Sequence, residues 1–144
     1  MTATAAIDIF PIALQRDVQP GSIVRCKFRG VELIVWRDDA DGVHVWEDRC
    51  PHRGVRLSAG RNLGDCIQAV YHGWKFGKDG GVIDIPAEGH SARADIRVKV
   101  FTCAVAGDFV WIGDRSGLKP LKRTQRSLTM PICAQFISMR LPLW

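Results

Sequence analysis

The stretch that decides the fold is residues 23–36, which read IVRCKFRGVELIVW. Polar and apolar side chains alternate through its first half, with Ile23, Arg25, Lys27 and Arg29 on one face and Val24, Cys26 and Phe28 on the other. A period of two residues is typical of a strand, because successive side chains point to opposite faces of a sheet. The dipeptide Arg29-Gly30 separates this half from the largely apolar segment VELIVW at 31–36. The stretch therefore predicts a β-hairpin.

Short segments of strand-forming sequence continue to residue 114. We expect strands at 42–48, 66–72, 74–76, 82–86, 98–105 and 109–114, the last two joined as a hairpin over residues 106–108. Turn-forming residues separate these segments, most clearly in KDGG at 78–81. No window of a dozen residues has the spacing of apolar positions that a helix requires. The sequence therefore predicts an all-β fold, either an antiparallel sandwich or a barrel.

Composition and charge point to one ordinary globular domain. The chain has 144 residues, of which 47% are hydrophobic, enough for a single core. Of the 20 Lys and Arg, 15 lie in residues 1–118 together with all 15 Asp and Glu, so the net charge of +5 comes from residues 119–144. We expect a neutral domain over 1–118 that does not bind nucleic acid, followed by a basic and apolar tail over 119–144 with no domain assigned.

The termini and the cysteines bear on the compartment. Residues 1–14 lack a basic start and contain Asp8, so they do not resemble a secretory signal. The apolar stretch 128–144 contains two prolines and Arg140, and it is too short and broken to span a bilayer. Five cysteines is an odd number, which favours free thiols or metal ligands over a disulfide framework. We expect a cytoplasmic protein without membrane association.

Two loops carry the residues with metal chemistry. Cys50-Pro51-His52 begins a loop rich in glycine and arginine at 49–65, and His72 lies in the second loop within Tyr71-His72-Gly73-Trp74. One loop thus offers a thiolate and an imidazole two residues apart, and the other offers a second imidazole. An iron–sulfur cluster held between two hairpin loops requires donors placed in this way.

These motifs resemble the Rieske domain of the Rieske non-heme iron (ring-hydroxylating) oxygenases. The resemblance covers about residues 8–115 and is carried by Cys50 to Gly54, Leu57 to Gly60 and Tyr71 to Phe76. It implies a Rieske-type antiparallel β-sandwich with a cluster-binding subdomain at about 47–76, and a [2Fe–2S] cluster. It further implies electron transfer with a redox partner, either a reductase or ferredoxin, or an oxygenase catalytic domain. At the matching positions, Cys50, His52 and His72 are the expected cluster and metal ligands, and no residue of this chain is expected to be catalytic.

The sequence departs from the family pattern at the fourth ligand, where Ala69 stands in place of a cysteine. The nearest thiol, Cys66, lies three residues upstream, about 10 Å along an extended strand, and the odd offset points it to the opposite face. Three outcomes are open. A cluster could be held by three protein ligands with Cys66, an external thiolate or water as the fourth. A mononuclear zinc or iron site could form on Cys50, His52 and His72. The site could also be empty.

The expected function follows from these alternatives. The chain is either an electron-transfer domain with a degenerate cluster site, or a cluster-free binding or assembly subunit, or a truncated oxygenase fragment. In the family, a catalytic domain with mononuclear iron follows this domain, whereas 26 residues without histidine follow Leu118 here. We therefore expect part of an oxidoreductase system and not a complete oxygenase, with a tail that marks an early or frame-shifted end.

Overall fold

The computed structural model describes residues 9–113, and within them the chain forms short strands and three single-turn 3₁₀ helices. The strands are β1 (Ile9–Leu14), β2 (Ile23–Phe28), β3 (Val31–Arg37), β4 (Val43–Glu47), β5 (Arg61–Asn62), β6 (Cys66–Gln68), β7 (Lys75–Gly77), β8 (Gly81–Ile85), β9 (Ser91–Arg97), β10 (Val100–Phe101), β11 (Cys103–Ala106) and β12 (Phe109–Gly113). The 3₁₀ helices are η1 (Gln15–Asp17), η2 (Leu57–Ala59) and η3 (Pro86–Glu88).

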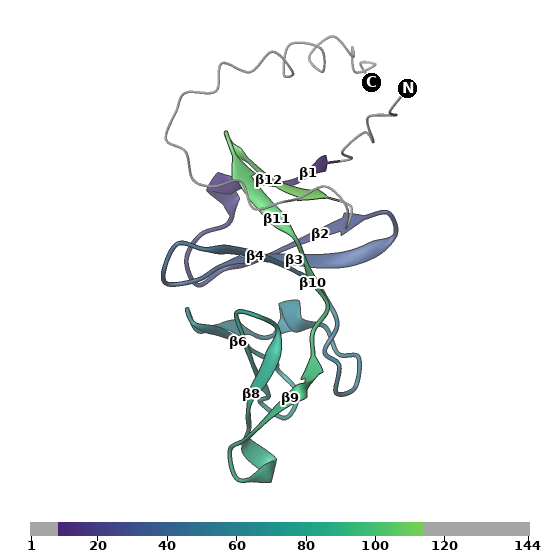
Figure 1. Ribbon diagram of the computed structural model, residues 1–144, viewed down its shortest axis with the longest axis vertical. Helices are drawn as coiled ribbons and strands as arrows, with labels where there is room; N and C mark the ends of the chain where they lie inside the picture. Colours follow the sequence, from purple (N-terminus) through teal and green to yellow (C-terminus); the bar gives the residue numbers. More distant parts are fainter. Residues whose placement is uncertain (1–8, 114–144) are drawn as a thin grey trace, which may run out of the picture.

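The strands form three antiparallel sheets stacked along the long axis of the molecule (Figure 1). The upper sheet has the order β1-β12-β11, the middle sheet β10-β4-β3-β2 and the lower sheet β5-β6-β7-β8-β9. The prediction of an all-β antiparallel fold is confirmed. The expected domain end at residue 118 and the tail at 119–144 lie outside the described residues.

The hairpin at 23–36 forms as predicted and is the centre of the middle sheet. Strands β2 and β3 pair without interruption from Ile23 opposite Trp36 to Phe28 opposite Val31. The two turn residues, Arg29 and Gly30, both have positive φ angles, of 48° and 82°. A two-residue turn of this kind matches the right-handed twist of the flanking strands.

Strand β3 divides the core into two parts. Its side chains Leu33 and Val35 pack with the upper sheet, whereas Ile34 and Trp36 pack with the lower one. The strand is therefore buried on both faces from Leu33 onward, which explains why 33–36 is a continuous apolar run and not an alternating one. The lower core, beneath β3, also contains Cys50, Ala69 and Trp74. Both metal-ligand loops are thus built around this part of the core.

Several elements differ from the sequence prediction. The strand expected at 98–105 is split into β10, which pairs with β4, and β11, which pairs with β12. The strand expected at 66–72 ends at Gln68, where the second loop begins. Strands β1, β5 and β9 were not predicted. In β9 polar and apolar residues do alternate, but its apolar positions are Ala92, Ala94 and Ile96, and alanine is a poor strand former. Tertiary pairing creates these strands where the local pattern does not.

His44 lies partly buried against the middle sheet. Its Nε2 lies 2.8 Å from Oδ2 of Asp38, and its ring stacks on Trp36 with centroids 4.5 Å apart. The buried Asp38 carboxylate, which the sequence did not reveal as buried, holds the ring on the sheet. In a separate finding, no helix within residues 9–113 is long and apolar enough to cross a membrane.

Candidate functional site

The two loops close in the same way. The amide of Cys50 donates to the carbonyl of Val55, and the amide of Ala69 donates to the carbonyl of Trp74, each over 2.8 Å and each five residues along the chain. Cys50 and Ala69 are both 3% exposed and belong to the same buried cluster. Ala69 therefore holds, in the second loop, the position that Cys50 holds in the first. A methyl group cannot ligate a metal, so this position contributes no donor.

The two imidazoles lie side by side. The ring centroids of His52 and His72 are 5.2 Å apart with an angle of 74° between the ring planes. His72 is exposed and has a positive φ of 60°, followed by Gly73 at 66°. A side chain in this left-handed region is uncommon outside tight turns and strained sites. The turn presents the His72 ring at the surface next to His52.

Contacts within the protein fix the orientation of the His52 ring. Its ring stacks on the indole of Trp74, with centroids 4.3 Å apart and planes within 7°. Among the described residues, its Nδ1 atom is buried and has no hydrogen-bond partner. Burial, the neighbouring His72 and the Arg53 guanidinium lower the pKa of His52, which favours the neutral ring that metals bind. A buried nitrogen without a partner is what an absent ligand leaves behind.

Cys50 is a buried thiol with amide donors around it. Burial raises its pKa, and hydrogen bonds from the amides of His52 and Arg53 act in the opposite direction. Amide donors of this kind stabilise a thiolate and tune the potential of a metal that it binds. The first loop therefore supplies both a sulfur and its hydrogen-bonding environment.

Cys66 lies on the other face of the lower sheet. Its neighbours Ile67 and Ala69 point into the lower core, whereas Cys66 is outside that cluster. Burial, a hydrogen bond with Asp65 and the charge of Asp65 raise the pKa of the Cys66 thiol to about 12. The alternation of the strand thus separates this thiol from position 69.

The donor set fits one half of a Rieske cluster. The two imidazoles are paired as the histidine-ligated iron requires, but the second iron would find the Cys50 sulfur and the Ala69 methyl. Within residues 9–113, no three His, Cys, Asp or Glu side chains group closely enough to hold a single metal ion. The arrangement therefore offers no ready mononuclear site, and the residues present do not complete a [2Fe–2S] site.

Asp48 positions the first loop and was missed by sequence reasoning. Its carboxylate accepts hydrogen bonds from the amide and the hydroxyl of Ser58, over 2.8 and 2.7 Å, and is buried. Arg25 and Arg56 reach it at 3.7 and 4.0 Å. The available signal was an acidic residue directly after a strand and before an arginine-rich loop.

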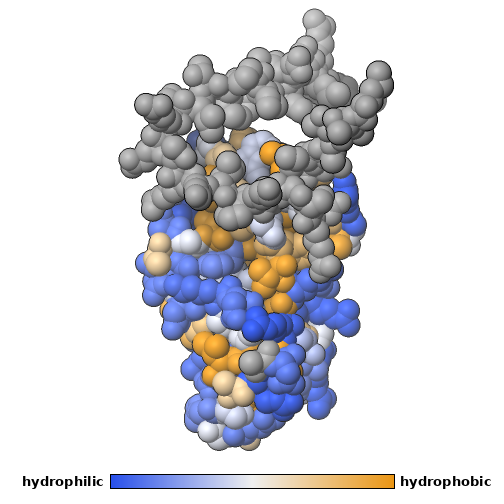
Figure 2. Space-filling model, in the orientation of Figure 1, coloured by the Kyte–Doolittle hydropathy of each residue, from blue (hydrophilic) through white to orange (hydrophobic). Residues whose placement is uncertain are grey.

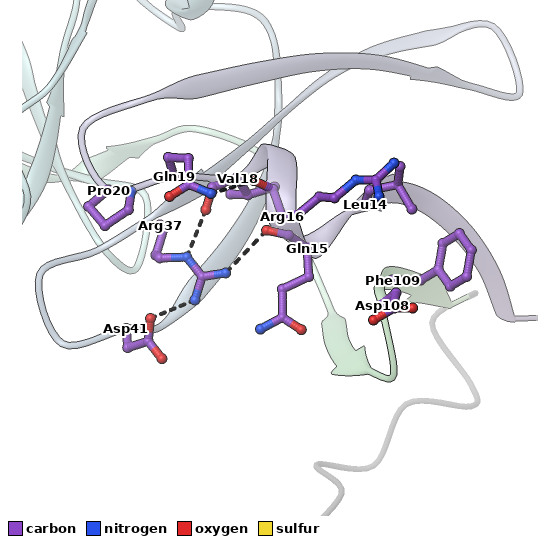
Figure 3. A pocket seen from close by; sticks show the side chains of 10 residues that line it. All are labelled: Leu14, Gln15, Arg16, Val18, Gln19, Pro20, Arg37, Asp41, Asp108 and Phe109. Carbon is purple, nitrogen blue, oxygen red and sulfur yellow. Dashed lines mark hydrogen bonds and ion pairs between the residues drawn. The ribbon is translucent and has the colours of Figure 1, made fainter.

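A cavity of about 560 Å³ lies elsewhere, between η1, β3 and the turn before β12 (Figure 3). The charged group at its centre is Arg37, which is buried. Its guanidinium donates to the Val18 carbonyl over 2.7 Å and to Asp41 over 2.6 Å. These bonds tie the η1 segment to β3, so the polar groups of this cavity have a structural role.

Comparisons with known proteins agree with the geometry. The family profile of the Rieske [2Fe-2S] domain matches residues 8–102. The oxidoreductase NdmD of Pseudomonas putida is 36% identical over 104 residues, 71% of this chain and 18% of the relative. The oxygenase subunit of phthalate 4,5-dioxygenase of Pseudomonas putida is 35% identical over 105 residues, 70% of this chain and 24% of the relative.

Solved structures show the same architecture. Dicamba monooxygenase superposes with a TM-score of 0.71 at 24% identity, covering 78% of this chain and 36% of the other. NdmB of Pseudomonas putida CBB5 superposes with a TM-score of 0.64 at 28% identity, covering 72% and 33%. The chain thus spans between 18% and 36% of the length of these relatives.

Proposed function

Because the chain belongs to the Rieske [2Fe-2S] domain family and is related to oxygenase components, we propose that it is a one-electron transfer domain with a degenerate cluster site. Family membership implies a [2Fe–2S] cluster, and such a cluster, when bound, supplies one-electron redox chemistry. The observation that carries the proposal is the equivalence of positions 50 and 69: the second loop keeps its closing hydrogen bond but has lost its sulfur.

The residues of this chain retain three of the four ligand roles. Cys50 would hold the thiolate-ligated iron, and His52 and His72 would hold the other iron at the surface. Trp74 fixes the plane of the His52 ring, and the amides of His52 and Arg53 stabilise the Cys50 thiolate. The missing fourth ligand weakens retention of the cluster, because each thiolate bond contributes to the free energy that holds the metal.

The proposal extends to the domain and its partner. Residues 1–118 form the iron–sulfur domain, with the cluster-binding subdomain at about 47–76. The partner is a reductase or ferredoxin, or an oxygenase catalytic domain on another chain, and the compartment is the cytoplasm. The relatives supporting this include an oxidoreductase and an oxygenase subunit, components of redox systems.

A second function is favoured by a specific observation. Protein contacts support the loops, namely the stack of His52 on Trp74 and the hydrogen bonds of Asp48 with Ser58. A domain whose loops are ordered in this way can serve as a cluster-free binding or assembly subunit. The two functions predict different results for the Ala69→Cys variant: an electron-transfer domain should gain a cluster, and a cluster-free binding subunit should not.

The test compares the chain with its Ala69→Cys variant. Both are purified without oxygen and analysed for iron, acid-labile sulfide, visible absorption and the EPR signal of the reduced protein. We expect substoichiometric iron in the unchanged chain. The Ala69→Cys variant should hold two iron and two sulfide per chain with a Rieske EPR signal, since all four ligands of such a cluster are then present.

Two controls make the outcome specific. Ala69→Ser places a hydroxyl where the thiol would be and should gain no cluster. Cys50→Ala in the Ala69→Cys background should lose the cluster again. A full Rieske cluster in the unchanged chain would show that the site is not degenerate, and no cluster in Ala69→Cys would favour the binding subunit.

A further inference from the structure

The first loop carries a group of exposed arginines that the ligand roles do not use. This arginine patch consists of Arg25, Arg49, Arg53 and Arg56. Arg25 on β2 and Arg56 in the loop converge on the same carboxylate, Asp48, at 3.7 and 4.0 Å, with about half of each arginine side chain exposed. A substituent at Gly54 would meet the guanidinium of Arg49 at 3.4 Å, so Arg49 lies over the loop next to Arg53.

The charge of the patch is poorly balanced. Asp48 is the carboxylate that reaches it, and the Asp48 side chain is 1% exposed, whereas all four guanidinium side chains are open to solvent. Within residues 9–113, neither Arg49 nor Arg53 forms an ion pair with an acidic side chain. The patch therefore presents several positive charges to solvent, while the exposed Glu88 carboxylate lies close enough to His52 to act to raise its pKa. Such a patch attracts a surface of opposite charge and accelerates its approach.

Arg53 connects the patch with the His52 imidazole, next to which an apolar surface lies. Arg53 follows His52 in the sequence, and its charge contributes to lowering the pKa of His52. On the other side, Tyr71 stacks against His52 with centroids 6.3 Å apart and is 44% exposed, and Val70 is 61% exposed. Tyrosine and arginine next to an exposed apolar side chain are the residue types that contribute most to protein interfaces.

We propose that Arg25, Arg49, Arg53 and Arg56, with Tyr71 and Val70, form the docking surface for an acidic redox protein that covers the His52–His72 pair. This inference rests on the proposed function for the redox character of the partner. A protein partner fits better than a nucleic acid, because residues 1–118 carry equal numbers of acidic and basic residues and the patch is confined to one loop and its neighbouring strand. In addition, the apolar surfaces of Tyr71 and Val70 can pack against apolar side chains of a protein, whereas a phosphate backbone offers no apolar groups for them to contact.

The test measures binding to an acidic ferredoxin of the plant type by stopped-flow fluorescence, using the full chain without iron. We expect binding in low salt, with an association rate constant that falls at least about tenfold in the Arg49→Glu, Arg53→Glu double variant. Raising the salt from about 50 to about 200 mM should lower the rate of the unchanged chain several-fold, because exposed charges are screened. Basic cytochrome c, a redox protein of opposite charge, should not bind.

The matched control is the double variant Arg16→Glu, Arg93→Glu, which makes the same change in net charge on η1 and β9, outside the patch. Its association rate should change less than about twofold. Equal loss in both double variants, or no binding of ferredoxin at all, overturns the docking surface. Tighter binding of a DNA duplex than of ferredoxin overturns the protein partner in favour of a nucleic acid. None of these binding measurements needs a cluster. If Ala69→Cys gains no iron but ferredoxin still binds, the electron-transfer function fails and the docking surface stands.

Discussion

The middle and lower sheets are built by different means. In the middle sheet, β2, β3 and β4 are five to seven residues long and pair without a shift in register. In the lower sheet, β5, β6 and β7 are two or three residues long, and the pairing of β7, β8 and β9 shifts at three places. The regular sheet is encoded by strand-forming sequence and the tight turn at 29–30, whereas the irregular one depends on what it is packed against.

That support comes from contacts between the two sheets. The side chain of Asn62 donates to the backbone carbonyl of Arg37 over 2.8 Å, and the amide of Asp39 donates to the carbonyl of Gly64 over 2.8 Å. Lys78 reaches Asp38 at 3.3 Å, and the indole of Trp74 packs in the lower core with Trp36 and Trp46. The surface of the lower sheet in Figure 2 is largely hydrophilic, with limited apolar areas. The two ligand loops therefore take their shape from the boundary between the sheets.

The largest effect is expected from Trp74→Ala, which removes the aromatic support of the second loop. Trp74 is 7% exposed and carries the His52 ring, so we expect a loss of about 3–5 kcal/mol in the free energy of unfolding. Urea unfolding followed by circular dichroism measures it. Trp74→Phe, which keeps a ring, should lose less, and the half-buried Trp111→Ala in the upper sheet is the control. A loss below about 1 kcal/mol for Trp74→Ala would show that the lower sheet does not depend on this contact.

A smaller effect is expected from acid, through Asp38 at the boundary. Burial alone would raise the pKa of Asp38, but hydrogen bonds from His44, from the amides of Gly42 and Ala40 and from Lys78 outweigh it and lower the pKa to about 2. The unfolded chain therefore binds this proton more readily. The stabilisation is complete above about pH 4 and is lost as the pH falls towards 2.

The measurement is the free energy of unfolding against pH for the unchanged chain and Asp38→Asn. The difference in the free energy of unfolding between the unchanged chain and Asp38→Asn should shrink as the pH falls from about 4 to about 2. Asp79→Asn, at an exposed turn in the lower sheet, corrects for other carboxylates whose pKa is also lowered. A constant difference between the two curves would contradict the role assigned to Asp38.

The smallest effect is expected from Cys66→Ala. The thiol lies outside the lower core, on the face opposite Ala69, so we expect a change below about 1 kcal/mol in the free energy of unfolding. In the Ala69→Cys background, the same substitution should leave the iron and sulfide content unchanged. A loss of iron there would show that Cys66 reaches the site and that the strand register differs from the one described.

Alternation and turn chemistry predicted the parts of the fold that depend on local sequence. The hairpin at 23–36, the strand expected at 42–48 (found as β4) and the final hairpin of β11 and β12 were all found. The division of 98–105 between two sheets was not predictable, because both halves have strand-forming sequence and their partners lie far along the chain. The roles of Asp38 and Asp48 were also missed, since nothing in their neighbours marks a carboxylate as buried.

The sequence by itself determined which donors the two loops carry and that position 69 has none, because ligand chemistry is a property of the side chain. Only the tertiary structure decided that Ala69 and Cys50 close their loops with the same hydrogen bond, that His52 rests on Trp74 with an unpaired nitrogen, and that Arg25 and Arg56 converge on Asp48. These relations join residues from different strands and loops. They depend on how the lower sheet packs against the middle one, and the alternation of side chains along a single strand does not specify that packing.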